Sequence, residues 1–191
     1  MGYKLEGNWK NGIAYDLHTL SSIYLGQDEF GRDRYDTKRS EMGELVYQLK
    51  YKHDESVVQK IINLLLNIKG LEKMDCIVAV PPSNLNRTYQ PVFSIAMALG
   101  KQLNIPVYLD CLIKNSNEEL KNVTDPEQRY NLLKQSMKIS KNYNLSNLNI
   151  LLLDDLYRSG ATLRVATELL YNNCNVKDVY VLTMTKTRSK R

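Results

Sequence analysis

The sequence predicts an α/β fold with a mainly parallel sheet flanked by helices and a small β-containing element at its N-terminus. The apolar run at 150–153, like that at 77–80, is short and bounded, which is typical of a strand buried on both faces of a parallel sheet. From residue 56 onward such runs alternate with helical patterns, which implies right-handed crossovers. Near the N-terminus, Asn11-Gly12 is a two-residue hairpin signal.

The individual elements can be assigned in chain order. Strands are expected around the Asn11-Gly12 turn, over 3–9 and 13–23, and residues 27–36 have the composition of a loop. Ser56 and Gln59 form a capping box before a helix that ends at Gly70. The remaining expected elements are helices over 39–52, 91–103, 125–139 and 163–173, and strands over 75–81, 106–113, 150–155 and 179–183.

Length and composition predict one soluble domain. The 191 residues suit a single core, with 43% hydrophobic and 25% charged residues. No apolar run approaches the roughly 20 residues needed to cross a bilayer, and the N-terminus lacks a signal-peptide core. Cys76, Cys111 and Cys174 are odd in number and far apart, so reduced thiols are expected rather than disulfides or a zinc site. These features favour a cytoplasmic protein without membrane association.

The segment 150–162, ILLLDDLYRSGAT, carries the most specific chemical signal. Asp154 and Asp155 are expected at the carboxyl end of a buried strand, where open α/β sheets bind ligands. The following turn, 159–162, opens a helix, so its backbone N–H groups lie at the positive end of the helix dipole beside two hydroxyls. This turn is therefore a candidate phosphate site.

Two carboxylates beside a phosphate need a partner that prevents repulsion. Vicinal ribose hydroxyls can donate to a carboxylate, and Mg²⁺ takes oxygen ligands while retaining waters. Together, Asp154, Asp155 and the turn predict a cradle for a phosphorylated ribose that carries a metal-bound second group. The alternative is a buried strand that ends in a surface turn with two capping acids.

This segment resembles the phosphoribosyl pyrophosphate signature of the type I phosphoribosyltransferases over all 13 positions. The resemblance implies that Asp154 and Asp155 are catalytic, hold the ribose hydroxyls and bind Mg²⁺ through water. Arg158 departs from the family, which usually has a small hydroxyl residue there, and it could either add a phosphate contact or obstruct the loop. The implied substrate-binding residues of this segment are Leu156, Tyr157, Arg158, Ser159, Gly160, Ala161 and Thr162.

A second loop, 81–89, leaves the expected neighbouring strand at the same edge of the sheet. In VAVPPSNLNRTYQP the chain resembles the ComF family of competence-associated phosphoribosyltransferases. The resemblance implies that Pro82 and Ser83 contact substrate and that Arg87 is a catalytic residue on the pyrophosphate side. Arginine suits bidentate phosphate binding. Taken alone, Arg87 would be an ordinary surface residue.

Two further segments match the same family, ELVYQLKYK at 44–52 and EQRYN at 127–131. Arg129 and Asn131 could order the rim of the site or bind pyrophosphate, or they could be surface charge and capping groups. Many ComF proteins begin with a four-cysteine zinc element, which this chain lacks. Residues 1–40 would instead form a small β hood that selects the acceptor, residues 41–185 the phosphoribosyltransferase-like core, and 186–191 a basic tail.

The resemblance implies a phosphoribosyltransferase that transfers phosphoribose from phosphoribosyl pyrophosphate, with Mg²⁺, to a nitrogen acceptor and releases pyrophosphate. The absence of an acid at 156–158 argues against hypoxanthine-type catalysis. The alternative is a non-catalytic protein that binds phosphoribosyl pyrophosphate or a nucleotide and acts in DNA uptake or processing. The net charge of +5 and the basic tail are compatible with nucleic acid or with a solvated terminus, and a homodimer remains open.

Overall fold

The computed structural model describes residues 2–82, 89–115, 125–141 and 143–188, and it confirms the predicted α/β class. All neighbouring strands of the main sheet run parallel except β1 and β2. The sheet has six strands in the order β1 (Tyr3–Lys4), β2 (Asn11–Leu17), β10 (Asp178–Lys186), β9 (Asn149–Tyr157), β5 (Cys76–Ala79) and β6 (Val107–Tyr108).

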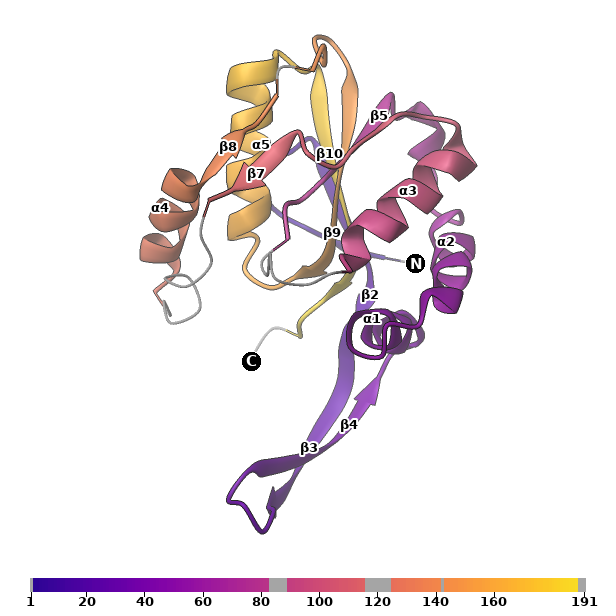
Figure 1. The fold of residues 1–191 in the computed structure, drawn as a ribbon, viewed down its shortest axis with the longest axis vertical. Helices are drawn as coiled ribbons and strands as arrows, with labels where there is room; N and C mark the ends of the chain where they lie inside the picture. The colour runs from indigo at the N-terminus through magenta and orange to yellow at the C-terminus, as the bar shows by residue number, and fades with distance from the viewer. Residues whose placement is uncertain (1, 83–88, 116–124, 142, 189–191) are drawn as a thin grey trace.

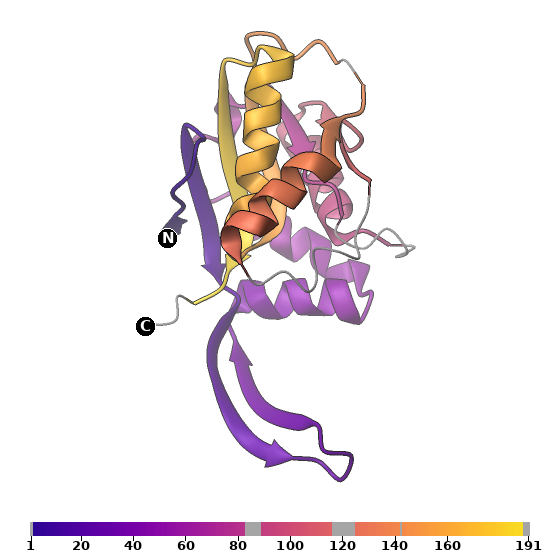
Figure 2. The same cartoon turned by 90° about the vertical axis from the view of Figure 1, so that its left-hand side faces the viewer.

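Helices cover both faces of this sheet, as Figure 1 and Figure 2 show. One face packs against α1 (Glu41–Tyr51), α2 (Val58–Leu65) and α3 (Pro91–Leu103). The other packs against α5 (Ala161–Cys174) and the adjacent α4 (Pro126–Ser136). Of these, α3 has the bounds that the sequence predicts, because Pro91 fixes its first turn and Asn104 ends it in the left-handed conformation, at φ 56°.

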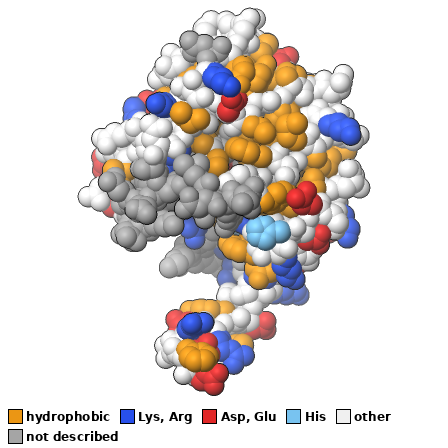
Figure 3. All heavy atoms as spheres, viewed as in Figure 1, with side chains coloured by type: hydrophobic (Ala, Val, Ile, Leu, Met, Phe, Trp, Pro, Cys, Tyr) orange, Lys and Arg blue, Asp and Glu red, His pale blue; other side chains and the backbone are white. Residues whose placement is uncertain are grey.

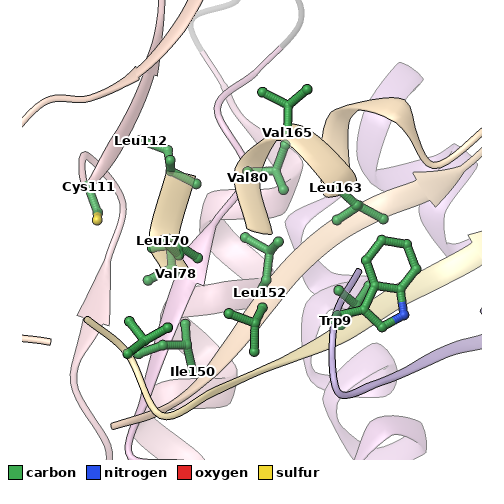
Figure 4. Packing of buried hydrophobic residues seen from close by; sticks show 14 of the residues in the cluster. Trp9, Val78, Val80, Cys111, Leu112, Ile150, Leu152, Leu163, Val165 and Leu170 are labelled. Atoms are coloured by element: carbon green, nitrogen blue, oxygen red, sulfur yellow. The ribbon is translucent and has the colours of Figure 1, made fainter. Parts of the chain in front are cut away.

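Side chains of the central strand β9 alternate between the two cores. Ile150 and Leu152 belong to the core on the α5 face, whereas Leu151 and Leu153 belong to the core beneath α1, α2 and α3. Figure 4 shows Leu152 among residues of the α5-side core. This period of two is the reason that the apolar run ILLL is continuous, since both of its faces are buried.

The predicted turn at Asn11-Gly12 is wrong, because both residues belong to β2. β1 and β2 do pair antiparallel, with Lys4 opposite Ile13, but residues 5–10 connect them. The Trp9 ring lies over this connection and donates from Nε1 to the Leu5 carbonyl at 3.0 Å. A Cβ at Gly12 would lie 2.3 Å from Trp9 Nε1, so glycine is required here by tight packing rather than by turn geometry.

A second hairpin, which we call the arm, leaves the body of the protein as a separate two-stranded sheet, visible in Figure 1 and Figure 2. It consists of β3 (Thr19–Gln27), a turn and β4 (Asp33–Arg39). The sequence assigned 27–36 to a loop, since the many charged residues of β4 hide its strand character. Because β1 and β2 belong to the main sheet, residues 1–40 are not one separate element, and only the arm projects.

Three other assignments differ from the structure. The expected strand over 106–113 is divided into β6 and β7 (Leu112–Lys114), and β7 pairs with β8 (Met137–Ile139) away from the main sheet. The helix expected to reach residue 139 therefore ends at Ser136, because the residues after it pair as a strand. Before α2, Asp54 caps a short 3-10 turn (Glu55–Val57), where its carboxylate accepts from the Ser56 N–H at 3.0 Å. The N-cap of α2 itself is Val57, which offers no side-chain hydrogen bond, so the predicted capping box is wrong.

The C-terminal segment is partly structured. Lys186 is the last residue of β10 and lies between Leu17 and Tyr157, so the predicted tail cannot begin there. Arg188 Nη1 donates to the Leu20 carbonyl of β3 at 2.6 Å, and residues 189–191 lie outside the described residues. None of the described helices combines the length and apolar character needed to span a membrane.

Candidate functional site

The two aspartates lie where β9 loses one of its neighbours. β5 pairs with β9 only as far as Ala79 and Leu153, and the Val80 N–H then donates to the Leu153 carbonyl at 3.0 Å. Beyond this point only β10 continues beside β9, with Thr183 opposite Asp154. The strand itself runs on to Tyr157, further than the sequence predicts, but the acids stand at the edge of the β5 side, where the sheet opens.

The alternation of β9 directs the two acids to different sides of the sheet. Continuing the period of two from Leu153 places Asp154 on the α5 side and Asp155 on the side of α1. Lys50, from the last turn of α1, confirms the second placement, since its Nζ lies 2.5 Å from Asp155 Oδ2. Only 21% of the Lys50 side chain and 13% of the Asp155 side chain are exposed, so solvent screens this ion pair only weakly.

The carboxyl group of Asp154 has a strongly perturbed pKa. Burial and the neighbouring Asp155 carboxylate raise its pKa to about 8, although the Asp155 N–H donates to Asp154 Oδ1 at 2.8 Å and Lys50 acts in the opposite direction. Burial disfavours the charged carboxylate, and a like charge nearby adds to that effect. Asp154 therefore keeps its proton at neutral pH, and a cation or a group of hydroxyl donors beside the two acids would favour its charged form.

The turn after β9 depends on Gly160. This residue has φ +78° and precedes α5 in the left-handed conformation, which strains any residue with a Cβ. A Cβ there would also lie 2.7 Å from Cε2 and 2.8 Å from the hydroxyl of Tyr157, so the aromatic ring covers the turn closely. Glycine is required for both reasons.

The first turn of α5 offers free backbone donors. No acidic residue lies in that turn, and its N-cap, Gly160, supplies no side-chain acceptor. The Ala161 N–H is the donor of a weak bond to the Ser159 hydroxyl, with 3.5 Å between the nitrogen and Oγ, which is the outer limit of a hydrogen bond. Ser159 and Ala161 line an open hollow together with Arg164, whereas Thr162 is half-buried. This helix end can accept an anion.

His18 and Thr185 connect the strand ends beside Asp155. His18 Nδ1 lies 3.1 Å from Thr185 Oγ1, and that hydroxyl lies 3.2 Å from the Asp155 carbonyl, to which it donates. Burial lowers the pKa of His18 first, and the positive charges of Arg39, Lys50 and Arg158 lower it further, against the opposing effect of Asp155. Arg158 itself is exposed, and no hydrogen bond or ion pair engages it within the described chain.

The structure brings one set of predicted site residues together and leaves another untested. Asp154, Asp155, Leu156 and Tyr157 form the end of β9, and 158–162 form the turn and the start of α5. Pro82 is half-buried, three residues after the end of β5 and so near this edge of the sheet. Ser83 and Arg87 lie outside the described residues.

The segment EQRYN also comes close to the turn. Glu127 and Tyr130 of α4 line the same hollow as Ser159, and Tyr130 donates to Glu168 of α5 at 2.6 Å. Asn131 is exposed, and the Arg129 side chain lies outside the described part of the chain. Both remain predictions for the rim of the site.

Sequence reasoning missed Lys50 and Thr185 as parts of the site. Lys50 lies within the segment ELVYQLKYK, but its contact with Asp155 joins residues that are 105 positions apart. Thr185 follows from pairing, since β10 places it opposite Leu156. Neither contact can be predicted from the residues next to it in the sequence. The position of Lys50 near the end of a helix that covers the sheet is the one feature that could have suggested a partner for an acid at a strand end.

The acid pair does not form a complete metal site. Among the described residues no group of three or more His, Cys, Asp or Glu side chains could hold a metal ion. Mg²⁺ commonly binds through one or two carboxylates, several waters and substrate phosphates. Asp154 and Asp155 fit that type of shared site, in which the substrate supplies the remaining oxygens.

Comparison with known proteins gives fold-level likenesses only. No family model matches the chain, and no curated protein matches its sequence. Among solved structures, the chain is similar to adenine phosphoribosyltransferase from Leishmania donovani, with 11% identity, a TM-score of 0.47, and 97% of this chain and 86% of that one covered. Orotate phosphoribosyltransferase from Aeropyrum pernix has 13% identity and a TM-score of 0.45, with 86% and 76% covered.

A third similar structure is a hypothetical protein from Neisseria gonorrhoeae with bound ppGpp. Its identity is 19% and its TM-score 0.44, and the likeness covers 74% of this chain and 71% of that protein. With identities below 20% and TM-scores below 0.5, these likenesses leave the ligand and the site residues of this chain open.

Proposed function

We propose that the chain is a phosphoribosyltransferase that binds phosphoribosyl pyrophosphate with Mg²⁺ and transfers phosphoribose to a nitrogen acceptor. One observation carries the proposal. The half-buried acid pair Asp154-Asp155 and the Gly160 turn at the start of α5 occupy one edge of the sheet, only a few residues apart. A phosphorylated sugar can use both features, because its two hydroxyls donate hydrogen bonds to the carboxylates and its phosphate accepts them from the N–H groups of the turn.

In this proposal each part of the segment binds a different part of the donor. The carboxylates of Asp154 and Asp155 accept hydrogen bonds from the ribose hydroxyls. The backbone N–H groups of Ala161 and Thr162, with the hydroxyls of Ser159 and Thr162, hold the 5′-phosphate. Tyr157 covers the turn, as its contact with Gly160 supports.

Asp154 and Asp155 would hold Mg²⁺ through water, and the substrate would supply the remaining oxygen ligands. When bound, the ion would neutralise charge on the departing pyrophosphate. The raised pKa of Asp154 supports this role, because a nearby cation would stabilise the deprotonated form of a carboxyl group that lies beside a second carboxylate.

The reaction is displacement of pyrophosphate from the anomeric carbon by a nitrogen nucleophile. The new bond joins that nitrogen to the anomeric carbon, and the carbon–oxygen bond to pyrophosphate breaks. The residues of this chain would act by positioning the ribose and the 5′-phosphate so that the acceptor faces the anomeric carbon. Arg87, from the loop after β5, is proposed to bind the leaving pyrophosphate.

Calorimetry with phosphoribosyl pyrophosphate, with and without Mg²⁺, tests this binding. We expect Mg²⁺-dependent binding that Asp154→Asn weakens, whereas Asp28→Asn in the arm, a matched change of an acid to its amide, leaves it unchanged. No binding to the wild-type protein would refute the proposal. Release of pyrophosphate in the presence of a panel of bases and amines then identifies the acceptor.

A second candidate function is binding of phosphoribosyl pyrophosphate or a nucleotide without transfer. The ion pair between Lys50 and Asp155 favours it, because an acid already paired at 2.5 Å has less need of a cation. The lack of a carboxylate at 156–158 agrees with it. Calorimetric binding with no pyrophosphate release across the whole panel would select this function over the enzyme.

A further inference from the structure

The arm presents an unusual amount of exposed apolar surface. Of the ten large hydrophobic side chains that are exposed in the described chain, six lie on the arm. They are Leu20, Ile23, Tyr24, Leu25, Phe30 and Tyr35. Figure 3 shows the arm standing clear of the body, with hydrophobic and charged side chains intermixed. An isolated two-stranded hairpin is at best marginally stable in water. Exposed apolar surface of this kind is typical of a site that binds another molecule.

The two edges of the arm differ in charge. β4 carries five charged residues among seven, which is a common protection against pairing with another strand. β3 has the sequence TLSSIYLGQ, nine residues without a charge or a proline. Its outer edge is unpaired in the described structure, apart from the Leu20 carbonyl, which accepts from Arg188. β3 is therefore the edge at which a further strand can add.

We propose that β3 pairs antiparallel with β3 of a second copy of this chain, so that two arms form one four-stranded sheet. The charge of the arm favours this partner. Residues 19–39 contain four acidic and four basic residues, although the whole chain has a net charge of +5. A neutral arm has no attraction for nucleic acid, and it can approach its own copy without repulsion.

Hydrogen bonds at the base of the arm fix its position relative to the main sheet. The His18 N–H donates to the Lys186 carbonyl at 2.8 Å, and Arg188 binds Leu20, so β3 leaves the main sheet from a fixed position. On the other strand, Ser40 caps α1 by accepting from the Gly43 N–H at 3.0 Å. A strand held in place loses less conformational freedom when it pairs.

Two-fold pairing places residues near the middle of β3 opposite residues of the same strand in the partner. With Ile23 at the centre, Ser22 lies opposite Tyr24 of the other copy and Ser21 opposite Leu25, and all of these side chains are uncharged. None of them brings a like charge opposite itself, whereas cross-strand apolar pairs stabilise a sheet. The interface would also cover exposed side chains, including Ile23, which is 59% exposed.

The mass of the full chain in solution tests the proposal without any ligand, so its outcome is separate from that of the proposed transferase function. Analytical ultracentrifugation should give a species of twice the 22.1 kDa chain mass. The double variant Ile23→Lys/Leu25→Lys should raise the dissociation constant at least about 10-fold. The matched variant Thr37→Lys, with its new charge on β4, should remain dimeric.

Cross-linking supplies a second measurement that does not depend on weakening the arm. Opposed residues of paired antiparallel strands have Cα atoms about 4.5–5.5 Å apart, which a disulfide can span. Under mild oxidation Ile23→Cys should give a covalent dimer that a reductant reverses, and Lys38→Cys on β4 should not. A monomeric wild-type protein, or equal cross-linking of the two variants, would overturn the proposal.

Discussion

Lys50 of α1 and Asp155 of β9 form an ion pair at 2.5 Å that joins a helix to the edge of the sheet where the second acid, Asp154, is half-buried. Lys50 partly offsets the negative charge of both aspartates. The net charge of the site therefore depends on a lysine from α1 as well as on the two aspartates of β9.

Replacing Lys50 should lower the stability of the protein and make that stability more dependent on Mg²⁺. Lys50→Met leaves Asp155 partly buried without its counter-ion, so we expect a loss of about 1–3 kcal/mol in the free energy of unfolding. Because Mg²⁺ can then take the place of the ammonium group, Mg²⁺ should stabilise Lys50→Met more than the wild type. Denaturant titrations with and without Mg²⁺ measure both effects. Lys52→Met, an exposed lysine at the end of the same helix, is the control, and equal effects in the two variants would contradict the expectation.

Asp154 should lower the stability of the fold as pH rises. Its pKa is raised from 3.8 to about 8 in the folded protein, so the folded state binds the extra proton over this interval. The stability that this proton contributes is complete below the unfolded pKa and is lost as pH rises through the folded pKa. Asp154→Asn removes this dependence.

The variant should therefore be more stable than the wild type at about pH 8, by at least about 1 kcal/mol, with a smaller difference at about pH 5. Chemical unfolding of both proteins at the two pH values gives the comparison. A difference that does not change with pH would mean that Asp154 titrates as an ordinary exposed acid.

Gly160→Ala should damage both the turn and the proposed phosphate site. The left-handed conformation costs a residue with a Cβ about 1–2 kcal/mol, and the added methyl group meets the Tyr157 ring. We expect that loss in the free energy of unfolding, together with weaker binding of phosphoribosyl pyrophosphate in calorimetry. Gly26→Ala has a positive φ of 92° and nothing within 4 Å of the new Cβ, so it separates backbone strain from contact with the ring. Unimpaired binding by Gly160→Ala would argue against the turn as the phosphate site.

Arg158→Ala should affect binding without affecting stability. The side chain is exposed, so the free energy of unfolding should change by less than about 0.5 kcal/mol. If Arg158 contacts phosphate, affinity for phosphoribosyl pyrophosphate falls about 10-fold, and its salt dependence becomes shallower. Arg34→Ala, an exposed arginine of the arm, should change neither. Tighter binding by Arg158→Ala would show that the arginine obstructs the loop.

His18 should report on the charge of the site. Burial and nearby cations, Lys50 among them, hold its pKa below 6.5. Its imidazole is therefore expected to be neutral at pH 7, and its NMR titration midpoint should rise in Lys50→Met because one of those cations is gone. The chain has one other histidine, His53, whose signal serves as the control. A midpoint that falls in Lys50→Met would contradict this description of the site.

Local sequence signals predicted the elements that are fixed by local physics. α3 begins at Pro91 as expected, because proline is compatible with the first helical turn. The continuous apolar run of β9 predicted a strand buried on both sides, and the fold has that strand at the centre of a mainly parallel sheet. The order of acids, turn and helix along 154–162 was likewise predictable, since it depends on neighbours in sequence.

The predictions that failed involve partners that are distant in sequence or surfaces without an apolar pattern. β4 was assigned to a loop because its charged residues face solvent, and it is a strand only because β3 lies beside it. Gly12 suggested a turn, but a glycine is required at this position because the Trp9 ring packs closely over the chain there.

The fold class and the acid-and-turn segment could be predicted from the order of residues, because side-chain alternation and helix-end chemistry are local properties of the chain. The pairing of Asp155 with Lys50 and the raised pKa of the half-buried Asp154 could not be predicted in this way, because they arise only in the folded molecule. Both the ion pair and the desolvation come from packing of elements that are distant in sequence, and Lys50 and Asp155 are 105 residues apart.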